Sequence, residues 1–117
     1  MKYLCLIYDE EAKWAAMSKE ENEAIMGEYM NFTSDVRHSG HFVAGEALQP
    51  VRTATSIRIR NGRVSTTDGP FAETREQLGG FYLIEARDLN DAIDVAQRIP
   101  SARLGTVEVR PVVQFDW

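Results

Sequence analysis

The stretch "KYLCLIY", residues 2–8, decides the fold, because it is apolar at both odd and even positions. Successive side chains of a strand point to opposite faces of its sheet. One face therefore carries Tyr3, Cys5 and Ile7, and the other carries Leu4, Leu6 and Tyr8. A strand with two apolar faces is covered on both sides. The run "GFYLIEA", residues 80–86, has the same character, so we predict two such strands within one sheet.

The chain around these strands contains signals for two helices. Ser18 is followed three residues later by Glu21, which predicts a capping box at the start of a long amphipathic helix. Asp88 is the expected cap of a second helix, which Pro100 ends. The expected buried side of this second helix consists of Leu89, Ala92, Ile93, Ala96 and Ile99. The segment "DEEAKWAAM", residues 9–17, is expected to be a polar connection.

A β-hairpin is predicted in the middle of the chain. The run "TATSIRIR", residues 53–60, alternates apolar and basic residues, and we expect Ile57 and Ile59 to face inward. Asn61-Gly62 predicts a type I′ turn, since both positions of this turn favour left-handed backbone. Further strands are expected in "HFVAGEALQP", "RVSTT" and "GTVEVRPVVQF".

This order of elements predicts an α+β domain with a ferredoxin-like split βαβ arrangement and an extra hairpin. Two helices cover only one face of the sheet, so the second apolar face needs another cover. A second copy of the chain, packed sheet to sheet, meets this need and predicts a homodimer. The space between the facing sheets is then either a ligand pocket or a filled core.

Length, charge and cysteine content limit the classes of function that the chain can have. The chain has 117 residues, which suits a single domain over residues 1–117, and a formal net charge of −5. A nucleic-acid partner is not expected, because nucleic-acid binders usually carry a basic face. The single cysteine, Cys5, cannot form an internal disulfide and is expected to be a small buried hydrophobe. No run approaches the length of about 18 apolar residues that a membrane span needs, and we predict a cytoplasmic protein.

Several runs together resemble the YCII-related family in its DGPF branch, over nearly the whole chain. They are "MKYLCLIY", "ALQP", "TATSIRIRNGRVSTTDGPFAETREQLGGFYLIEARDLNDAIDVA" and "GTVEVRP". The resemblance implies a dimeric α+β barrel, in a superfamily of small lyases, isomerases and oxygenases that often need no metal. It also implies an alternative role, as a regulatory or interaction module associated with an extracytoplasmic-function sigma factor. Related members have a proposed His–Asp pair, which His38 and His41 do not clearly reproduce.

Asp68, in the stretch "TDGPFAETREQLGG", is the candidate catalytic residue. It ends a predicted strand before Gly-Pro, and two interpretations stay open. Its carboxylate is suited to act as a general base, and equally to accept backbone N–H bonds in a turn. Glu73 and Arg75 are candidate ligand-binding residues, or else form a solvated ion pair. Phe71 is expected to anchor the loop in the core.

Tyr8 and Glu46 are candidate ligand-binding residues in the pocket between the facing sheets. A buried carboxylate at such a place has a raised pKa and can transfer protons. His38 and His41 have no carboxylate or cysteine at metal-ligand spacing, so neither a metal nor another cofactor is expected. The expected function is a homodimer that binds a small polar or anionic molecule, with or without acid–base chemistry of the lyase or isomerase kind.

Overall fold

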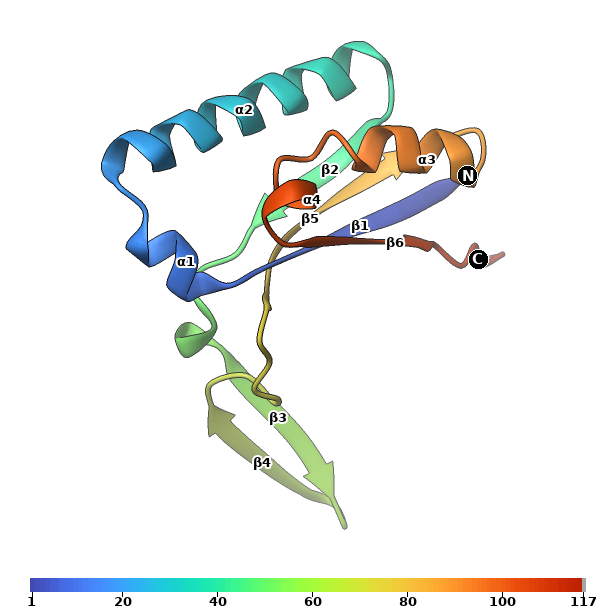
Figure 1. Ribbon diagram of the computed structural model, residues 1–117. Coiled ribbons are helices and arrows are strands. Elements are labelled where there is room, and N and C mark those ends of the chain that lie inside the picture. The colour runs from blue at the N-terminus through green and yellow to red at the C-terminus, as the bar shows by residue number, and fades with distance from the viewer. Residues whose placement is uncertain (117) are drawn as a thin grey trace.

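The computed structural model describes residues 1–116, which form six strands and four α-helices (Figure 1). The strands are β1 (Lys2–Asp9), β2 (Phe42–Ala47), β3 (Thr55–Arg60), β4 (Arg63–Asp68), β5 (Gln77–Glu85) and β6 (Thr106–Pro111). The helices are α1 (Glu11–Ala16), α2 (Lys19–His38), α3 (Leu89–Ala96) and α4 (Ser101–Leu104), with a short 3₁₀ turn, η1 (Val51–Thr53). Within these residues, no helix has both the length and the apolar character that a membrane crossing requires.

Four strands form an antiparallel sheet in the order β2-β5-β1-β6, with β5 and β1 at its centre. This order, with α2 following β1 and α3 following β5, is the ferredoxin-like arrangement that the sequence predicts. Helices α2, α3 and α4 lie on one side of the sheet (Figure 1). The predicted α+β class is therefore confirmed.

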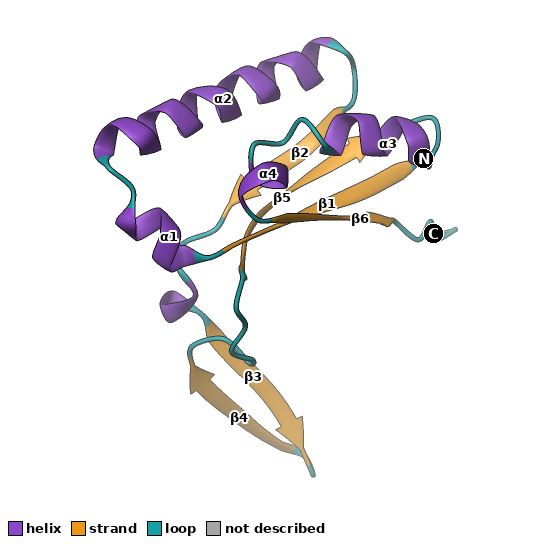
Figure 2. Cartoon of the chain, viewed as in Figure 1, coloured by secondary structure: helices purple, strands orange, loops and turns teal. Residues whose placement is uncertain are grey.

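The core lies between the sheet and these helices. From β1 it receives Tyr3, Cys5 and Ile7, which confirms that Cys5 is a buried small hydrophobe. Helices α2 and α3 contribute Phe32, Val36, Ala92, Val95 and Ala96, and Ile99 joins them from the segment between α3 and α4. The other face of the sheet, which we call the open face, carries the half-buried Leu4, Leu6, Phe81 and Leu83. Within residues 1–116, no helix or strand covers the open face (Figure 2).

Helix α2 begins as its sequence predicts. The Ser18 hydroxyl accepts a hydrogen bond from the Glu21 backbone N–H at 3.1 Å, and the Glu21 carboxylate accepts one from the Ser18 N–H at 3.5 Å. The helix ends at His38, and Gly40 follows with a φ of 81°, a value that favours glycine. Both ends of the longest helix are thus set by local signals.

Three expectations about the helices are wrong. The segment expected as a polar connection contains α1, because "EAKWAA" consists mostly of strong helix formers. A further short helix, α4, follows Pro100. On α3, Leu89 and Ile93 are exposed, while Asp91 and Val95 are buried. Helix α3 is therefore only partly rotated from the predicted face, because Ala92, Ala96 and Ile99 are buried as expected while Asp91 and Val95 are buried in place of Leu89 and Ile93.

The predicted hairpin forms, but it does not join the main sheet. Asn61 and Gly62 have φ values of 53° and 75°, as the type I′ turn requires. Strands β3 and β4 make a separate two-stranded sheet that projects from the end of the molecule, and we call residues 55–68 the arm (Figure 1). Ile57 and Ile59 are 65% and 62% exposed, so the expectation that they face inward is wrong within one chain.

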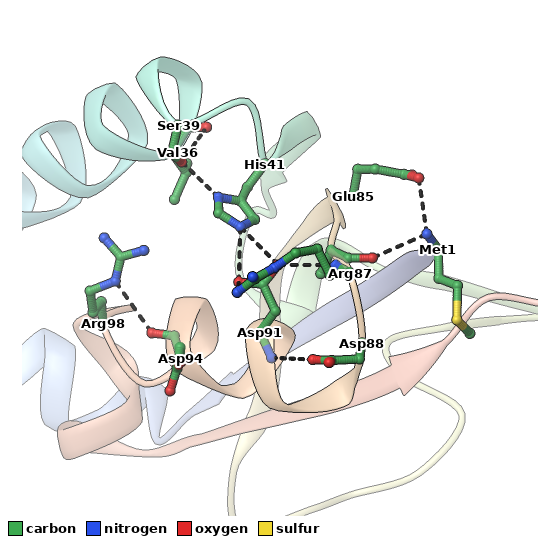
Figure 3. Close-up of polar contacts among 11 residues, drawn as sticks. Met1, Val36, Ser39, His41, Glu85, Arg87, Asp88, Asp91, Asp94 and Arg98 are labelled. Carbon is green, nitrogen blue, oxygen red and sulfur yellow. Dashed lines mark hydrogen bonds and ion pairs between the residues drawn. The ribbon is translucent and has the colours of Figure 1, made fainter.

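A polar latch ties the start of β2 to α3 (Figure 3). The Asp91 carboxylate accepts a hydrogen bond from the Arg87 backbone N–H at 3.0 Å and lies 3.2 Å from His41 Nε2. The Arg87 guanidinium approaches it at 3.5 Å, and Ser39 Oγ lies 2.7 Å from His41 Nδ1. These contacts, led by the Arg87 N–H, lower the pKa of Asp91 to about 2 against the opposing effect of burial.

We expect Asp91→Asn to lower the melting temperature, and the loss to depend on pH. A carboxyl group with a depressed pKa stabilises the fold above its unfolded pKa of about 3.9, and this contribution disappears as the pH falls through about 2. Thermal unfolding followed by circular dichroism between pH 5 and pH 2 measures the difference. Asp94→Asn, a change at an aspartate on the same helix, is the control. A deficit that stays constant down to pH 2 would contradict the assignment.

Candidate functional site

A groove of about 1190 Å³ runs between the helices and the sheet. It exists because only Ile25, Phe32 and Val36 of the 20-residue α2 are buried, so much of this helix stands off the sheet. Residues from α1, α2, β2, η1 and β5 line it. The apolar part of the lining includes Ile7, Trp14, Met26, Met30, Phe42 and Leu48. The volume suits a small organic molecule with an apolar body.

A chain of hydrogen bonds crosses the groove at the end of β1. The Ser101 hydroxyl, on α4, donates to Asp9 Oδ2 at 2.7 Å, and the Tyr29 hydroxyl, on α2, lies 2.5 Å from Ser101 Oγ. Asp9 and Tyr29 both line the groove, while Ser101 is fully buried. The three residues come from β1, α2 and α4, so the tertiary fold assembles this chain.

Burial raises the pKa of both Asp9 and Tyr29, the two ends of this row of hydrogen bonds. Desolvation raises the pKa of Asp9, although the hydrogen bonds from Ser101 and Trp14 oppose the rise. Desolvation likewise raises the pKa of Tyr29 to about 12, so its phenol stays protonated near neutral pH. Tyr29 therefore donates to Ser101, and Ser101 donates to Asp9. A carboxyl group with a raised pKa, held in a defined position, is suited to proton transfer.

Close packing fixes the Asp9 backbone. Gly105 follows α4, and a Cβ atom built on it would stand 2.6 Å from Asp9 Oδ1 and would collide with the Tyr8 carbonyl. No side chain fits between α4 and the end of β1. The absence of a side chain at Gly105 thus lets Ser101 come within hydrogen-bonding distance of Asp9.

The end of the groove away from Asp9 carries a positive charge, that of Arg37. The Arg37 guanidinium, near the end of α2, lies over the Phe42 ring at 4.5 Å from its centroid. Between the two ends, Thr33 Oγ1 lies 2.7 Å from the Tyr82 hydroxyl. The groove therefore offers the Asp9 carboxylate at one end, an apolar wall with hydroxyl groups, and the Arg37 cation at the other end, while Glu11, Glu46 and Arg52 also line it.

The structure separates the residues that the sequence selects as candidates. Asp68 ends the exposed arm and does not line the groove, and Glu73 and Arg75 lie in the exposed segment after it. Arg75 Nε approaches Glu10 Oε1 at 3.4 Å, but the Arg75 side chain is almost fully exposed. Glu46 is exposed and borders the groove. No geometry here brings Asp68 and Glu46 together, and the roles of these residues stay predictions.

Two nearby residues lie outside the groove. Tyr8 belongs to the open face, where a pocket between facing sheets was expected, so its role in ligand binding stays a prediction. Phe71, which was expected to anchor its loop in the core, is 81% exposed. The reason is that the loop leads from the arm and not from the body of the sheet (Figure 1).

Sequence reasoning missed Asp9, although a signal for it was present. Alternation along β1 places Asp9 on the same face as Ile7, just where the apolar run ends. An acid at that position lies at the edge of the core, where burial raises its pKa. Its partners could not be predicted in the same way, because Tyr29 and Ser101 are far apart in the sequence and α4 was not expected.

The latch places Ser39, His41 and Asp91 in a row, and these are the three residue types of a serine-hydrolase triad. A serine nucleophile requires backbone or side-chain donors for a developing oxyanion. Ser39 caps the carbonyl end of α2, and the N–H groups of Ser39, Gly40 and His41 already bond to carbonyl groups of that helix. These three N–H groups therefore offer no oxyanion site to Ser39, and the row ties β2 to α3. His41 and Asp91 nevertheless form a His–Asp pair, which the sequence was not expected to reproduce clearly. Among residues 1–116, no three metal-ligating side chains cluster as a metal site would require.

Comparisons with known proteins identify the family of the chain. Residues 1–116 match the YCII-related domain. The chain belongs to the YCII-related family. It is also 37% identical over 117 residues to an uncharacterized protein, R00369, of Rhizobium meliloti (strain 1021), covering 98% of this chain and 94% of that protein. Membership of the YCII-related family is thus shown along essentially the whole chain, while the DGPF branch rests on the motif in the sequence.

We expect Ser101→Ala to raise the pKa of Asp9 further, because the Ser101 hydrogen bond stabilises the ionised carboxylate. Carboxyl ¹³C chemical shifts of labelled aspartate, titrated with pH, measure this change, and Asp9→Asn assigns the signal. Ser34→Ala, which removes a hydroxyl from another part of the groove wall, is the matched control. An Asp9 titration that is the same in Ser101→Ala and in the wild type would show that the hydrogen bond has no influence.

Proposed function

We propose that the chain binds a small organic acid with an apolar body in the groove, and that Asp9 exchanges a proton with it. The observation that carries this proposal is the Asp9 carboxyl group, which lines an apolar groove, has a raised pKa and is held by the buried Ser101. General bases commonly have this environment.

The charges of the groove support this ligand class. An anionic group is favoured near Arg37 and disfavoured near Asp9. The charge of Glu11, at the Asp9 end, is partly offset by Arg52, which also lines the groove and follows Val51, whose N–H donates to Glu11. A carboxylate at the Arg37 end would leave a C–H or O–H group of the ligand near Asp9. In the proposed step, that proton moves to an Asp9 oxygen and its electron pair stays on the ligand. Return of the proton to another ligand atom completes an isomerase-like reaction.

The proposal includes a homodimer in which the open faces of two copies pack together. The open face carries Leu4, Leu6, Phe81 and Leu83, and an apolar area of this kind usually marks an interaction site. Because the groove lies on the helix side of the sheet, packing at the open face leaves it accessible. The alternative role, a regulatory module working with an extracytoplasmic-function sigma factor, is a proposal that rests on family resemblance alone.

We expect the protein to accelerate exchange of ligand protons with solvent, and Asp9→Asn to slow it by roughly 100-fold or more, the typical contribution of a general base. The assay incubates the protein in D₂O with a panel of 2-oxo and 3-oxo carboxylic acids that have apolar side chains. Loss of the proton signal next to the carbonyl group is followed by ¹H NMR.

Two further variants make this experiment decisive. Asp94→Asn, outside the groove, is expected to exchange protons at the wild-type rate. Asp68→Asn tests the competing candidate: loss of exchange in this variant, with Asp9→Asn unaffected, would move the catalytic carboxylate to the arm. Absence of exchange with every acid in the panel would count against proton transfer on this ligand class.

A further inference from the structure

The arm has one apolar face and one basic face. In its register, Ile59 pairs with Val64 and Ile57 with Thr66, so these side chains share a face. The pairs on the other face include Arg58 with Ser65 and Arg60 with Arg63. Ile57, Ile59 and Val64 are all more than 60% exposed.

An arm of this kind is not expected to be stable alone. A single two-stranded hairpin is marginally stable in water and needs packing against another surface. Within residues 1–116, no other helix or strand packs extensively on β3 or β4. The arm also begins at a closed base, where the Gly69 N–H donates to the Ala54 carbonyl at 2.7 Å and the Ser56 hydroxyl donates to the Gly69 carbonyl at 2.9 Å. The arm is thus held at its base while its apolar face lacks a cover.

Charge favours a second copy of this chain as the cover. The arm contains three arginines, Arg58, Arg60 and Arg63, against the single acid Asp68. The whole chain has a net charge of −5, so the remainder is strongly acidic. The arginines lie on the face opposite Ile57 and Ile59, so they do not contact a surface that covers the apolar face. Their charge instead attracts the arm as a whole to the acidic body of another copy, whereas two arms repel each other.

The position of the arm points to the same partner. The arm projects from the sheet on the side away from α2 and α3, which is the side of the open face (Figure 1). A second copy that covers the open face would therefore lie beside the arm. The arm and the open face would then border the same second copy.

We propose that the arm is an intermolecular clasp. In the homodimer, each arm lays the face with Ile57, Ile59 and Val64 against the body of the other copy, while the open faces pack together. This inference rests on the homodimer proposed above, but it does not depend on ligand binding or proton transfer in the groove. It gives the segment before the "DGPF" motif a role in assembly.

The test is the dissociation constant of the dimer, measured on the full chain by sedimentation velocity over a range of concentrations. We expect the double variant Ile57→Asn/Ile59→Asn, which keeps the charge of the arm, to dimerise at least tenfold more weakly than the wild type. The control is Ser65→Asn/Thr67→Asn, which places the same two side chains on the opposite face of the arm and is expected to leave the constant unchanged. Far-UV circular dichroism checks that the body of each variant is folded.

An arm deletion gives a second measurement. Replacing residues 55–68 by two glycines joins ends that already lie within hydrogen-bonding distance, and we expect a folded chain with at least tenfold weaker dimerisation. In the wild type, hydrogen exchange should show greater amide protection of the arm at protein concentrations where the dimer forms.

The outcomes separate the clasp from the other proposals. A wild-type dimer that is equally stable in the isoleucine double variant and in the arm deletion overturns the clasp and leaves the dimer. A wild-type chain that is monomeric at every concentration overturns both, and would leave the arm to a different partner. Proton exchange in the groove is measured independently, so its failure leaves the result on assembly unchanged.

Discussion

The central constraint on this molecule is that β1 lies in the middle of the sheet with only one of its faces under the helices. Its odd-numbered residues, Tyr3, Cys5 and Ile7, fill the core, and its even-numbered residues remain on the open face. Both proposed functional surfaces follow from this alternation. On the covered side, the strand continues from Ile7 to the carboxylate of Asp9, which therefore reaches the groove partly desolvated. On the other side, Leu4 and Leu6 remain available to a second copy.

Much of the fold could be predicted because its signals are local. The capping box of Ser18 and Glu21 involves residues three positions apart, and Asn61-Gly62 specifies its turn by backbone preference alone. Strand alternation was sufficient to predict the centre of the sheet. It was also sufficient, in principle, to place Asp9 beside the core. Sequence reasoning selected the neighbouring Tyr8 for a pocket between facing sheets, and Tyr8 does lie on the opposite, open face.

The remaining features depend on contacts between distant residues. Ser101 lies 92 residues from Asp9 and 72 from Tyr29, and His41 lies 50 residues from Asp91. No spacing rule predicts such pairs. The rotation of α3 has the same origin, because burying Asp91 is possible only where the Arg87 N–H and His41 meet its carboxylate. Apolar periodicity alone placed Leu89 and Ile93 on the buried side.

Because the groove lies within one chain, the proposed dimer is not needed to form it. Sequence reasoning placed a pocket between two facing sheets, whereas the groove is formed within one chain, between its sheet and its helices. Tyr8 and Asp9 are consecutive residues of β1, yet one belongs to the open face and the other to the groove. A dimer closed at the open face would therefore leave the space proposed for a ligand unoccupied. Assembly and proton transfer would then use opposite faces of one strand, so that each can be removed by substitution without the other.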